Sequence, residues 1–178
     1  MTEKVEHSVV LKVEDIEVRR YPKMILASVS GVSDEEAFGL LFDYISGNNG
    51  SSESIAMTAP VISGSGRSEK LPMTTPVVSS AGSFSFVMPL GRDVGSLPRP
   101  RDERIALVEV TERIVATLRF RGRTKPQHVM LREAQLQEEL NRRGISAIGK
   151  PFLMRYNPPF VPGFLRRNEV GVEVNMQD

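Results

Sequence analysis

The chain reads Ile55-Ala56-Met57-Thr58-Ala59-Pro60-Val61, and the Met-Thr-x-Pro-Val pattern returns sixteen residues later as Met73-Thr74-Thr75-Pro76-Val77. Because side chains alternate between the two faces of a strand, Met57 and Met73 each share a face with the valine of their own copy. The proline of each copy has no N–H to donate, which predicts an edge position or a bulge. The repeat therefore predicts two similar, paired strands, whose methionines either wall a ligand pocket or belong to an ordinary core.

The composition is typical of a soluble globular protein with one domain: 178 residues, 40% of them hydrophobic and 25% charged. The formal net charge is +1, so no overall field draws the chain to nucleic acid. Two short basic clusters, Arg119-Arg121-Arg123-Lys125 and Arg142-Arg143, are interpreted as solvated faces. Cysteine is absent, which excludes disulfides, thiolate metal sites and a cysteine nucleophile.

Residues 1–15 alternate charged and short apolar groups and lack the apolar core of a signal peptide. They are interpreted as a leader whose end joins the first strand. No stretch approaches the length of apolar sequence that a membrane span needs. We expect a cytoplasmic protein, without a membrane partner or direct contact to nucleic acid.

The first half of the chain predicts strands at 16–21 and 24–31, and then a helix from 34 to about 46. The capping box Ser33-Asp34-Glu35-Glu36 marks the start of this helix, whose broad apolar face includes Phe38 and Phe42. The two Met-Thr-x-Pro-Val strands and a strand at 84–89 follow. A linker is expected at 91–104, which contains two prolines.

The second half repeats this plan, with strands at 105–110 and 113–122 and a helix that begins at the capping box Thr124-Lys125-Pro126-Gln127. Strands at 151–156 and 169–174 close the chain. Alternation in the last strand puts Glu169 and Glu173 on one face, which is interpreted as the solvent side. The pattern predicts an α+β fold in a single domain, 1–178, built from duplicated strand-strand-helix-strand halves at about 15–90 and 104–175.

Several motifs in this order resemble the SOUL/heme-binding protein family. They are the first Met-Thr-x-Pro-Val copy and the segments Val18-Arg19-Arg20-Tyr21, Phe42-Asp43-Tyr44-Ile45-Ser46-Gly47-Asn48-Asn49, Tyr156-Asn157-Pro158-Pro159 and Arg166-Arg167-Asn168-Glu169-Val170. The resemblance covers about residues 15–175. It implies a distorted antiparallel β-barrel flanked by two helices, with heme or another tetrapyrrole held in a hydrophobic cleft. The same architecture resembles the effector-binding domains of some bacterial transcription regulators.

The sequence departs from the family at two proposed heme contacts. Some animal members carry a histidine, proposed as an axial iron ligand, where this chain has Arg20, and a guanidinium does not ligate iron because it stays protonated. Other members place basic residues on the first helix to meet the heme propionates. Here that helix reads Phe38-Gly39-Leu40-Leu41-Phe42-Asp43, without a base. The resemblance therefore implies a tetrapyrrole held without a clear axial ligand.

The candidate ligand-binding residues are aromatic, sulfur-containing or cationic side chains of these motifs: Phe38, Phe42, Met57, Met73, Phe160, Phe164, Arg166 and Arg167. Arg166-Arg167 follows Phe160 and Phe164 across a proline-stiffened loop, which suits a planar amphipathic ligand with carboxylates. The alternative is that one of these arginines pairs with Glu169 or Asp43 and holds the loop.

No metal site and no catalytic residue is predicted. His7 and His128 are interpreted as surface histidines, because two distant histidines without an acidic cluster are not a metal signature. Ligation of iron by Met57, Met73 or Tyr21 is feasible chemically, but packing is the preferred interpretation. Hydrolase, metalloprotease and phosphate-loop motifs are absent.

Three hypotheses of function follow. The first is a non-enzymatic protein that binds a tetrapyrrole or another small hydrophobic ligand, although the sequence does not require a cofactor. The second is an effector-sensing module that acts through a protein partner of unknown identity. The third is an enzyme that acts on a bound tetrapyrrole, for which a carboxylate with a raised pKa in a cleft would be the marker.

Overall fold

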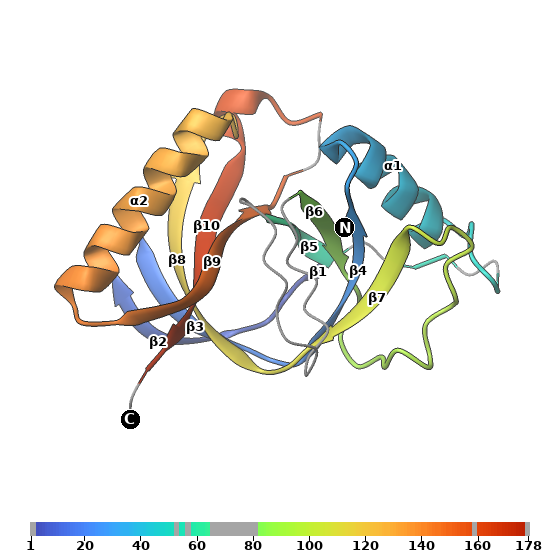
Figure 1. Cartoon of the computed structure of the whole chain (residues 1–178), viewed down its shortest axis with the longest axis horizontal. Helices are drawn as coiled ribbons and strands as arrows, with labels where there is room; N and C mark the ends of the chain where they lie inside the picture. The colour runs from blue at the N-terminus through green and yellow to red at the C-terminus, as the bar shows by residue number, and fades with distance from the viewer. Residues whose placement is uncertain (1–2, 52–53, 56–57, 65–81, 158–159, 177–178) are drawn as a thin grey trace. The chain divides into compact units, whose positions relative to one another are not determined.

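The structure is a computed structural model that describes residues 3–51, 54–55, 58–64, 82–157 and 160–176. Its α+β class, its antiparallel strands and its two helices, one against each group of strands, confirm the fold class predicted from the sequence. The chain divides into two compact units, which we call the first unit (residues 1–5 and 23–111) and the second unit (residues 6–22 and 112–178) (Figure 1).

The first unit is an antiparallel sheet covered by one helix, α1 (Asp34–Ile45). Its strands lie in the order β5 (Thr58–Gly64), β6 (Ser83–Val87), β4 (Met24–Ser30) and β7 (Ile105–Val110), and the short β1 (Glu3–Lys4) pairs in parallel with β5. The predicted capping box is present, because Ser33 Oγ accepts a hydrogen bond from the backbone N–H of Glu36 at 3.2 Å. The buried face of α1 packs on the sheet through Ala37, Leu41, Tyr44 and Ile45.

The first copy of the Met-Thr-x-Pro-Val pattern lies partly in β5. The register between β5 and β6 shifts between Thr58 and Val61, so Pro60 lies at an irregularity of the ladder, as the missing N–H of proline predicts. Met57 and the second copy, with Met73, lie outside the described residues. Their predicted contact with a ligand therefore stays a prediction.

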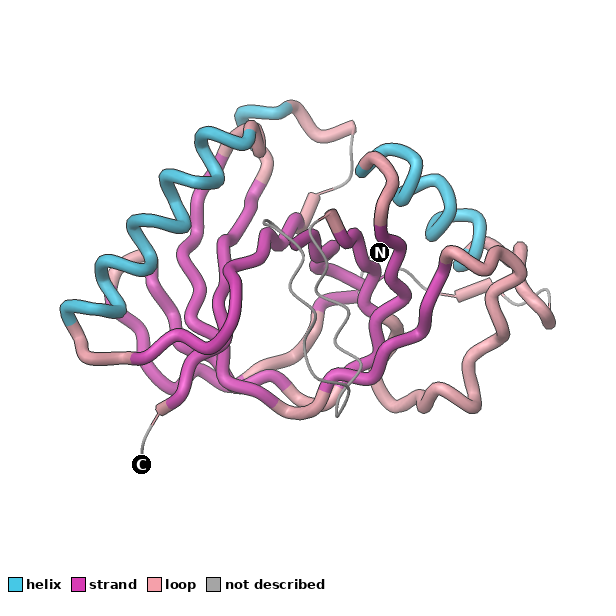
Figure 2. The backbone as a smooth tube through the Cα atoms, viewed as in Figure 1, coloured by secondary structure: helices cyan, strands magenta, loops and turns pink. Residues whose placement is uncertain are grey.

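The second unit is an antiparallel sheet of five strands covered by α2 (Pro126–Arg142). The order is β2 (Ser8–Val13), β3 (Ile16–Tyr21), β8 (Arg113–Arg121), β10 (Arg167–Asn175) and β9 (Ser146–Arg155), and a 3-10 turn, η1 (Gly163–Leu165), precedes β10. Figure 2 shows α2 as the longer helix, running along the strands of this unit. Its buried residues Val129, Leu136 and Leu140 pack on apolar side chains from β3, β8, β9 and β10.

The leader predicted at residues 1–15 is wrong, because this segment contains β1 and β2. Residues of β2 pair with β3, with Leu11 opposite Val18 and Val13 opposite Ile16. The β-branched residues of this segment favour a strand, but two adjacent valines break the alternation that signals one in a sequence.

The first strand of each predicted half pairs with a strand of the other half. In chain order both halves contain two strands, a helix and two more strands, as β3-β4-α1-β5-β6 and β7-β8-α2-β9-β10. However, β3 pairs with β8 in the second unit and β7 pairs with β4 in the first unit. The compact units therefore differ from the sequence halves, and the internal duplication stays a prediction.

Replacing Leu136 by Ala should lower the free energy of unfolding by about 2–5 kcal/mol, because Leu136 is only 1% exposed and the truncation leaves a cavity beneath α2. Urea unfolding followed by circular dichroism measures this loss. Met130→Ala is the matched control on the same helix, since Met130 is 66% exposed, and it should change stability by less than about 0.5 kcal/mol. Equal effects of the two variants would contradict the described packing of α2.

Candidate functional site

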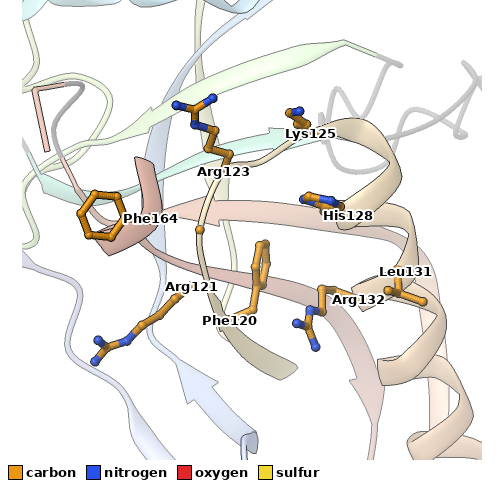
Figure 3. Close-up of a pocket in the computed structure, with 9 residues that line it drawn as sticks. Phe120, Arg121, Arg123, Lys125, His128, Leu131, Arg132 and Phe164 are labelled. Atoms are coloured by element: carbon orange, nitrogen blue, oxygen red, sulfur yellow. The ribbon is translucent and has the colours of Figure 1, made fainter. Parts of the chain in front are cut away.

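A cavity of about 660 Å³ opens in the second unit, beside the end of β8, the first turns of α2 and η1 (Figure 3). We call it the basic pocket. Its volume falls within the range of roughly 300–1,000 Å³ that is typical of small-molecule sites. It is lined by Phe120, Arg121, Gly122, Arg123, Lys125, His128, Leu131, Arg132 and Phe164.

The β8 side of the basic pocket is held by the turn at Gly122. This residue has a φ of +116°, a conformation that a side chain disfavours and glycine adopts freely. Its N–H donates to the carbonyl of Arg166 at 3.0 Å, and its carbonyl accepts a hydrogen bond from Asn168 Nδ2 at 2.8 Å. These two bonds fix the end of β8 against the segment that leads into β10.

The start of α2 forms a second side of the basic pocket, and it differs from the prediction. The helix begins at Pro126 with Lys125 as its N-cap, so the capping box predicted from Thr124 to Gln127 is wrong. The reason is that a residue before proline avoids helical angles, and Lys125 accordingly has an extended ψ of 141°. Lys125 gives no side-chain cap, because its ammonium group has no acceptor. The positive end of the helix dipole therefore lies uncapped beside the pocket.

Successive turns of α2 present His128, Leu131 and Arg132 to the basic pocket. Their spacing of three and four residues places them on one face of the helix. The guanidinium carbon of Arg132 lies 5.8 Å from the centre of the Phe120 ring, within the range of a cation–π contact. Figure 3 shows His128 and Arg132 extending from α2 toward the strand that carries Phe120.

The loop before β10 brings Phe164 to the third side of the basic pocket. A Cβ atom on Gly163 would lie 2.7 Å from Cγ and 2.8 Å from Nε of Arg123, so a side chain at position 163 would force Arg123 to move. Arg166 Nε donates to the carbonyl of Val161 at 2.8 Å and braces the same loop. Phe164 itself remains 74% exposed, which leaves its ring available to a ligand.

The charge around the basic pocket is uniformly positive. Four cationic residues line it, and no acidic residue does. Within the described part of the chain, no carboxylate forms an ion pair with Arg121, Arg123 or Lys125. In contrast, Arg142 and Arg143 at the end of the same helix pair with Glu138 and Glu139. The unpaired cations, together with the helix terminus, favour an anionic ligand.

The face of the second-unit sheet that points away from α2 carries a buried ionic network. Glu169 is 0% exposed and accepts two hydrogen bonds from Arg19, Nη1 to Oε2 at 2.7 Å and Nη2 to Oε1 at 2.8 Å. It also accepts hydrogen bonds from the hydroxyl of Tyr156 at 2.6 Å and from Arg167 Nη2 at 3.0 Å. Arg19 Nε donates in turn to Glu17 at 2.7 Å. We call these residues the Arg19–Glu169 network.

The network keeps its members in defined charge states. Burial alone would raise the pKa of Glu169, but the hydrogen bonds from Arg19, Tyr156 and Arg167 outweigh it and lower this pKa to about 2. Burial would lower the pKa of Arg19, but the hydrogen bond to Glu169 raises it above its ordinary value. Burial raises the pKa of Tyr156, so its hydroxyl stays a donor. Glu169 is thus ionised and fully engaged at neutral pH.

The network bears on two interpretations of the sequence, the side on which Glu169 lies and the partner of Arg166-Arg167. The interpretation of Glu169 as a solvent-facing residue is wrong, because the face opposite α2 is also buried at this point of β10. The alternative that an arginine of Arg166-Arg167 pairs with Glu169 is confirmed for Arg167, whose guanidinium also lies 4.8 Å from the centre of the Tyr156 ring.

The predicted ligand residues do not form one group. Among those that the structure describes, only Phe164 lines the basic pocket. Phe160 is 85% exposed, and Phe38 and Phe42 stack on each other in the first unit, where Phe38 also contacts Phe86. Sequence reasoning missed four kinds of pocket residue, namely the cluster at 121–125, Phe120, His128 and the pair Leu131 and Arg132. The basic cluster is exposed, as predicted. The feature of the sequence that could have placed it at the pocket is its position directly before a helix that no side chain caps.

Within the described residues, neither helix combines the length and the apolar run that a bilayer crossing requires. No three side chains of the metal-binding types gather in that part of the chain.

Replacing Glu169 by Gln should lower the free energy of unfolding at neutral pH by about 3–5 kcal/mol, because Arg19 loses its buried carboxylate partner and keeps only the ion pair with the partly exposed Glu17. The pH dependence should change as well. The ionised form of Glu169 stabilises the fold fully above its unfolded pKa near 4.5, and this contribution is lost as the pH falls through the folded pKa of about 2. Urea unfolding at a series of pH values should therefore show a steeper loss between pH 4.5 and 2 in the wild type than in the variant.

Glu173→Gln is the matched control, since Glu173 lies on the same strand and face but is partly exposed, and its nearest basic group, Arg113, is 3.9 Å away. It should keep the wild-type pH profile. An unchanged profile in Glu169→Gln would show that Glu169 is not held ionised by its neighbours.

Comparison with solved structures shows which proteins share this fold. The chain is similar to the C-terminal domain of EcmrR, with a TM-score of 0.59 and 10% identity over 90% of this chain and 96% of that one. It is also similar to an uncharacterized conserved protein from Listeria innocua, with a TM-score of 0.60 and 12% identity over 98% of this chain and 93% of that one. A hydrolase from the same organism is similar with a TM-score of 0.58 and 13% identity, over 90% of this chain and 92% of that one. At these identities the likeness shows the fold alone.

No curated protein matches the sequence. The model of the family described as SOUL heme-binding protein matches residues 2–173, which is nearly the whole chain. This match and the shared motifs agree with the α+β architecture described above. The protein belongs to the SOUL heme-binding protein family.

Proposed function

We propose that the protein binds a tetrapyrrole, heme or a related porphyrin, without covalent attachment and without catalysing a reaction. The observation that carries this proposal is the basic pocket, in which unpaired cations and aromatic rings surround a cavity of about 660 Å³ with no acidic residue in its lining. Membership of the family supports the ligand class.

The residues of the basic pocket fit both parts of such a ligand. The Phe164 and Phe120 rings and the Leu131 side chain offer apolar surface to the flat macrocycle. Arg121 and Arg123 offer guanidinium groups, which bind carboxylates through paired hydrogen bonds, to the propionates. When bound, the heme would supply its iron as a further point of attachment. These contacts replace the basic residues that the first helix lacks.

Binding is favoured over catalysis because of the charge states in the second unit. A carboxylate with a raised pKa would be the marker of an enzyme, but the pKa of the buried Glu169 is lowered, and its oxygens accept hydrogen bonds from Arg19, Tyr156 and Arg167. No acidic residue lines the basic pocket. The basic pocket therefore lacks the carboxylate that would mark an enzyme of this kind.

Hemin titration of the 178-residue chain, followed by the Soret band, tests the proposal, with saturable binding at micromolar concentration as the expected result. The double variant R121Q/R123Q should bind hemin at least about tenfold more weakly, since a hydrogen bond to a charged group contributes about 1.5–3 kcal/mol. Phe164→Ala should also weaken binding, because the macrocycle loses an exposed ring. Arg142→Gln is the matched control, because Arg142 lies on α2 outside the pocket and pairs with Glu138.

Two outcomes would contradict the proposal. Absence of saturable hemin and porphyrin binding would exclude a tetrapyrrole, and binding of other aromatic carboxylates in that case would favour the effector-sensing module. Hemin binding that is equally strong in R121Q/R123Q would place the ligand outside the basic pocket.

A further inference from the structure

His128 is the one lining residue of the basic pocket whose side chain can ligate iron. The other lining side chains are hydrocarbon, or they are guanidinium and ammonium groups that donate hydrogen bonds and offer no lone pair. A neutral imidazole is the commonest nitrogen ligand of metals in proteins, and a single histidine holds the iron of many hemes. The sequence had no means to single out His128, because the residues around it come from three separate segments.

The position of His128 suits a ligand that approaches from the side of α2. It occupies the third position of the helix, four residues before Arg132, so both side chains lie on the face that meets the cavity. Figure 3 shows the imidazole extending between Lys125 and Arg132 into the space beside β8. The ring is exposed and not buried in the core, so a bound molecule can reach its nitrogen.

Cationic and aromatic side chains line the cavity around His128. Arg121 and Arg123 lie on the β8 side of the cavity, and Phe164 lies on the loop side. If the arginines held the propionates of a heme, the apolar lining would face its macrocycle, and His128 would be the side chain available to its iron. Among the lining residues, His128 is the one side chain that would hold the iron.

We propose that His128 is the single axial ligand through which the protein holds the iron of heme. This inference rests on the proposed function and deepens it, because it assigns the iron contact that Arg20 does not provide. It makes the protein selective for iron porphyrin over the metal-free macrocycle.

The test compares hemin with metal-free protoporphyrin IX in the wild type, His128→Ala and His7→Ala, each as the 178-residue chain. His128→Ala should lose the Soret shift of the wild type and bind hemin at least about tenfold more weakly, since loss of outer-shell partners alone costs about 10–100-fold in metal affinity. Added imidazole should restore the wild-type spectrum in His128→Ala. Affinity for protoporphyrin IX, followed by its own fluorescence, should stay within about twofold because that ligand has no iron. His7→Ala should match the wild type for both ligands.

The outcomes separate this inference from the proposed function. If neither macrocycle binds to the wild type, the proposed function fails and the iron contact fails with it. If hemin binds and its spectrum and affinity are the same in His128→Ala, the pocket holds heme but His128 does not ligate it. A spectrum with two histidine ligands that is lost in His7→Ala would also overturn the single-ligand arrangement. Circular dichroism confirms folding of each variant, and imidazole rescue separates a lost ligand from a damaged fold.

Discussion

Arg19 and Glu169 are 150 residues apart in the chain, yet their side chains meet in a bidentate ion pair within the second-unit sheet. Neither is more than 3% exposed, so both charges lose their contact with water on folding. The ion pair between them compensates for this loss. The pair joins β3 to β10, two strands that both flank β8. The central strands of the unit are thereby fixed in one register, because a slip of one residue would turn both charges to the opposite face.

The residues of β10 connect the Arg19–Glu169 ion pair to the basic pocket. Arg167 joins the network at the first residue of that strand, and the preceding residue, Arg166, accepts the hydrogen bond that closes the turn at Gly122. The neighbouring Asn168 binds the carbonyl of the same glycine. The loop that carries Phe164 therefore enters β10 from a segment held on one side by buried charges and on the other by the end of β8. Such a frame holds Phe164 in a fixed position at the edge of the basic pocket.

The Arg19–Glu169 network and the basic pocket both contain arginines, but the arginines are paired with carboxylates only in the network. In the Arg19–Glu169 network each arginine has a carboxylate partner, and the charges are buried and structural. In the basic pocket Arg121 and Arg123 are exposed and have no carboxylate partner among the described residues. The formal net charge of +1 does not reveal the difference between paired and unpaired arginines. A chain with nearly balanced charges can still concentrate unpaired cations at one cavity. The proposed binding site lies where the pairing of charges is incomplete.

Local signals in the sequence predicted most of the elements correctly. Alternation from Ile16 to Tyr21 corresponds to β3, and Ser33 caps α1 as its pattern indicates, because both depend on neighbours within a few residues. The shared motifs also identified the family. The prediction was wrong at Thr124, where the restriction that Pro126 imposes on Lys125 outweighs the capping-box pattern, and at Glu169, where alternation does not tell which face is buried.

By itself the sequence determined the α+β class, the two helices and the motifs of the family, since these follow from short-range chemistry and periodicity. Only the tertiary structure decided that β3 pairs with β8 and β7 with β4, that Arg19 and Glu169 neutralise each other, and that Phe164 meets Arg123 and His128 at one cavity. The physical reason is that strand register brings together side chains from distant segments. A charge is paired or left open to a ligand according to the neighbours that the register provides.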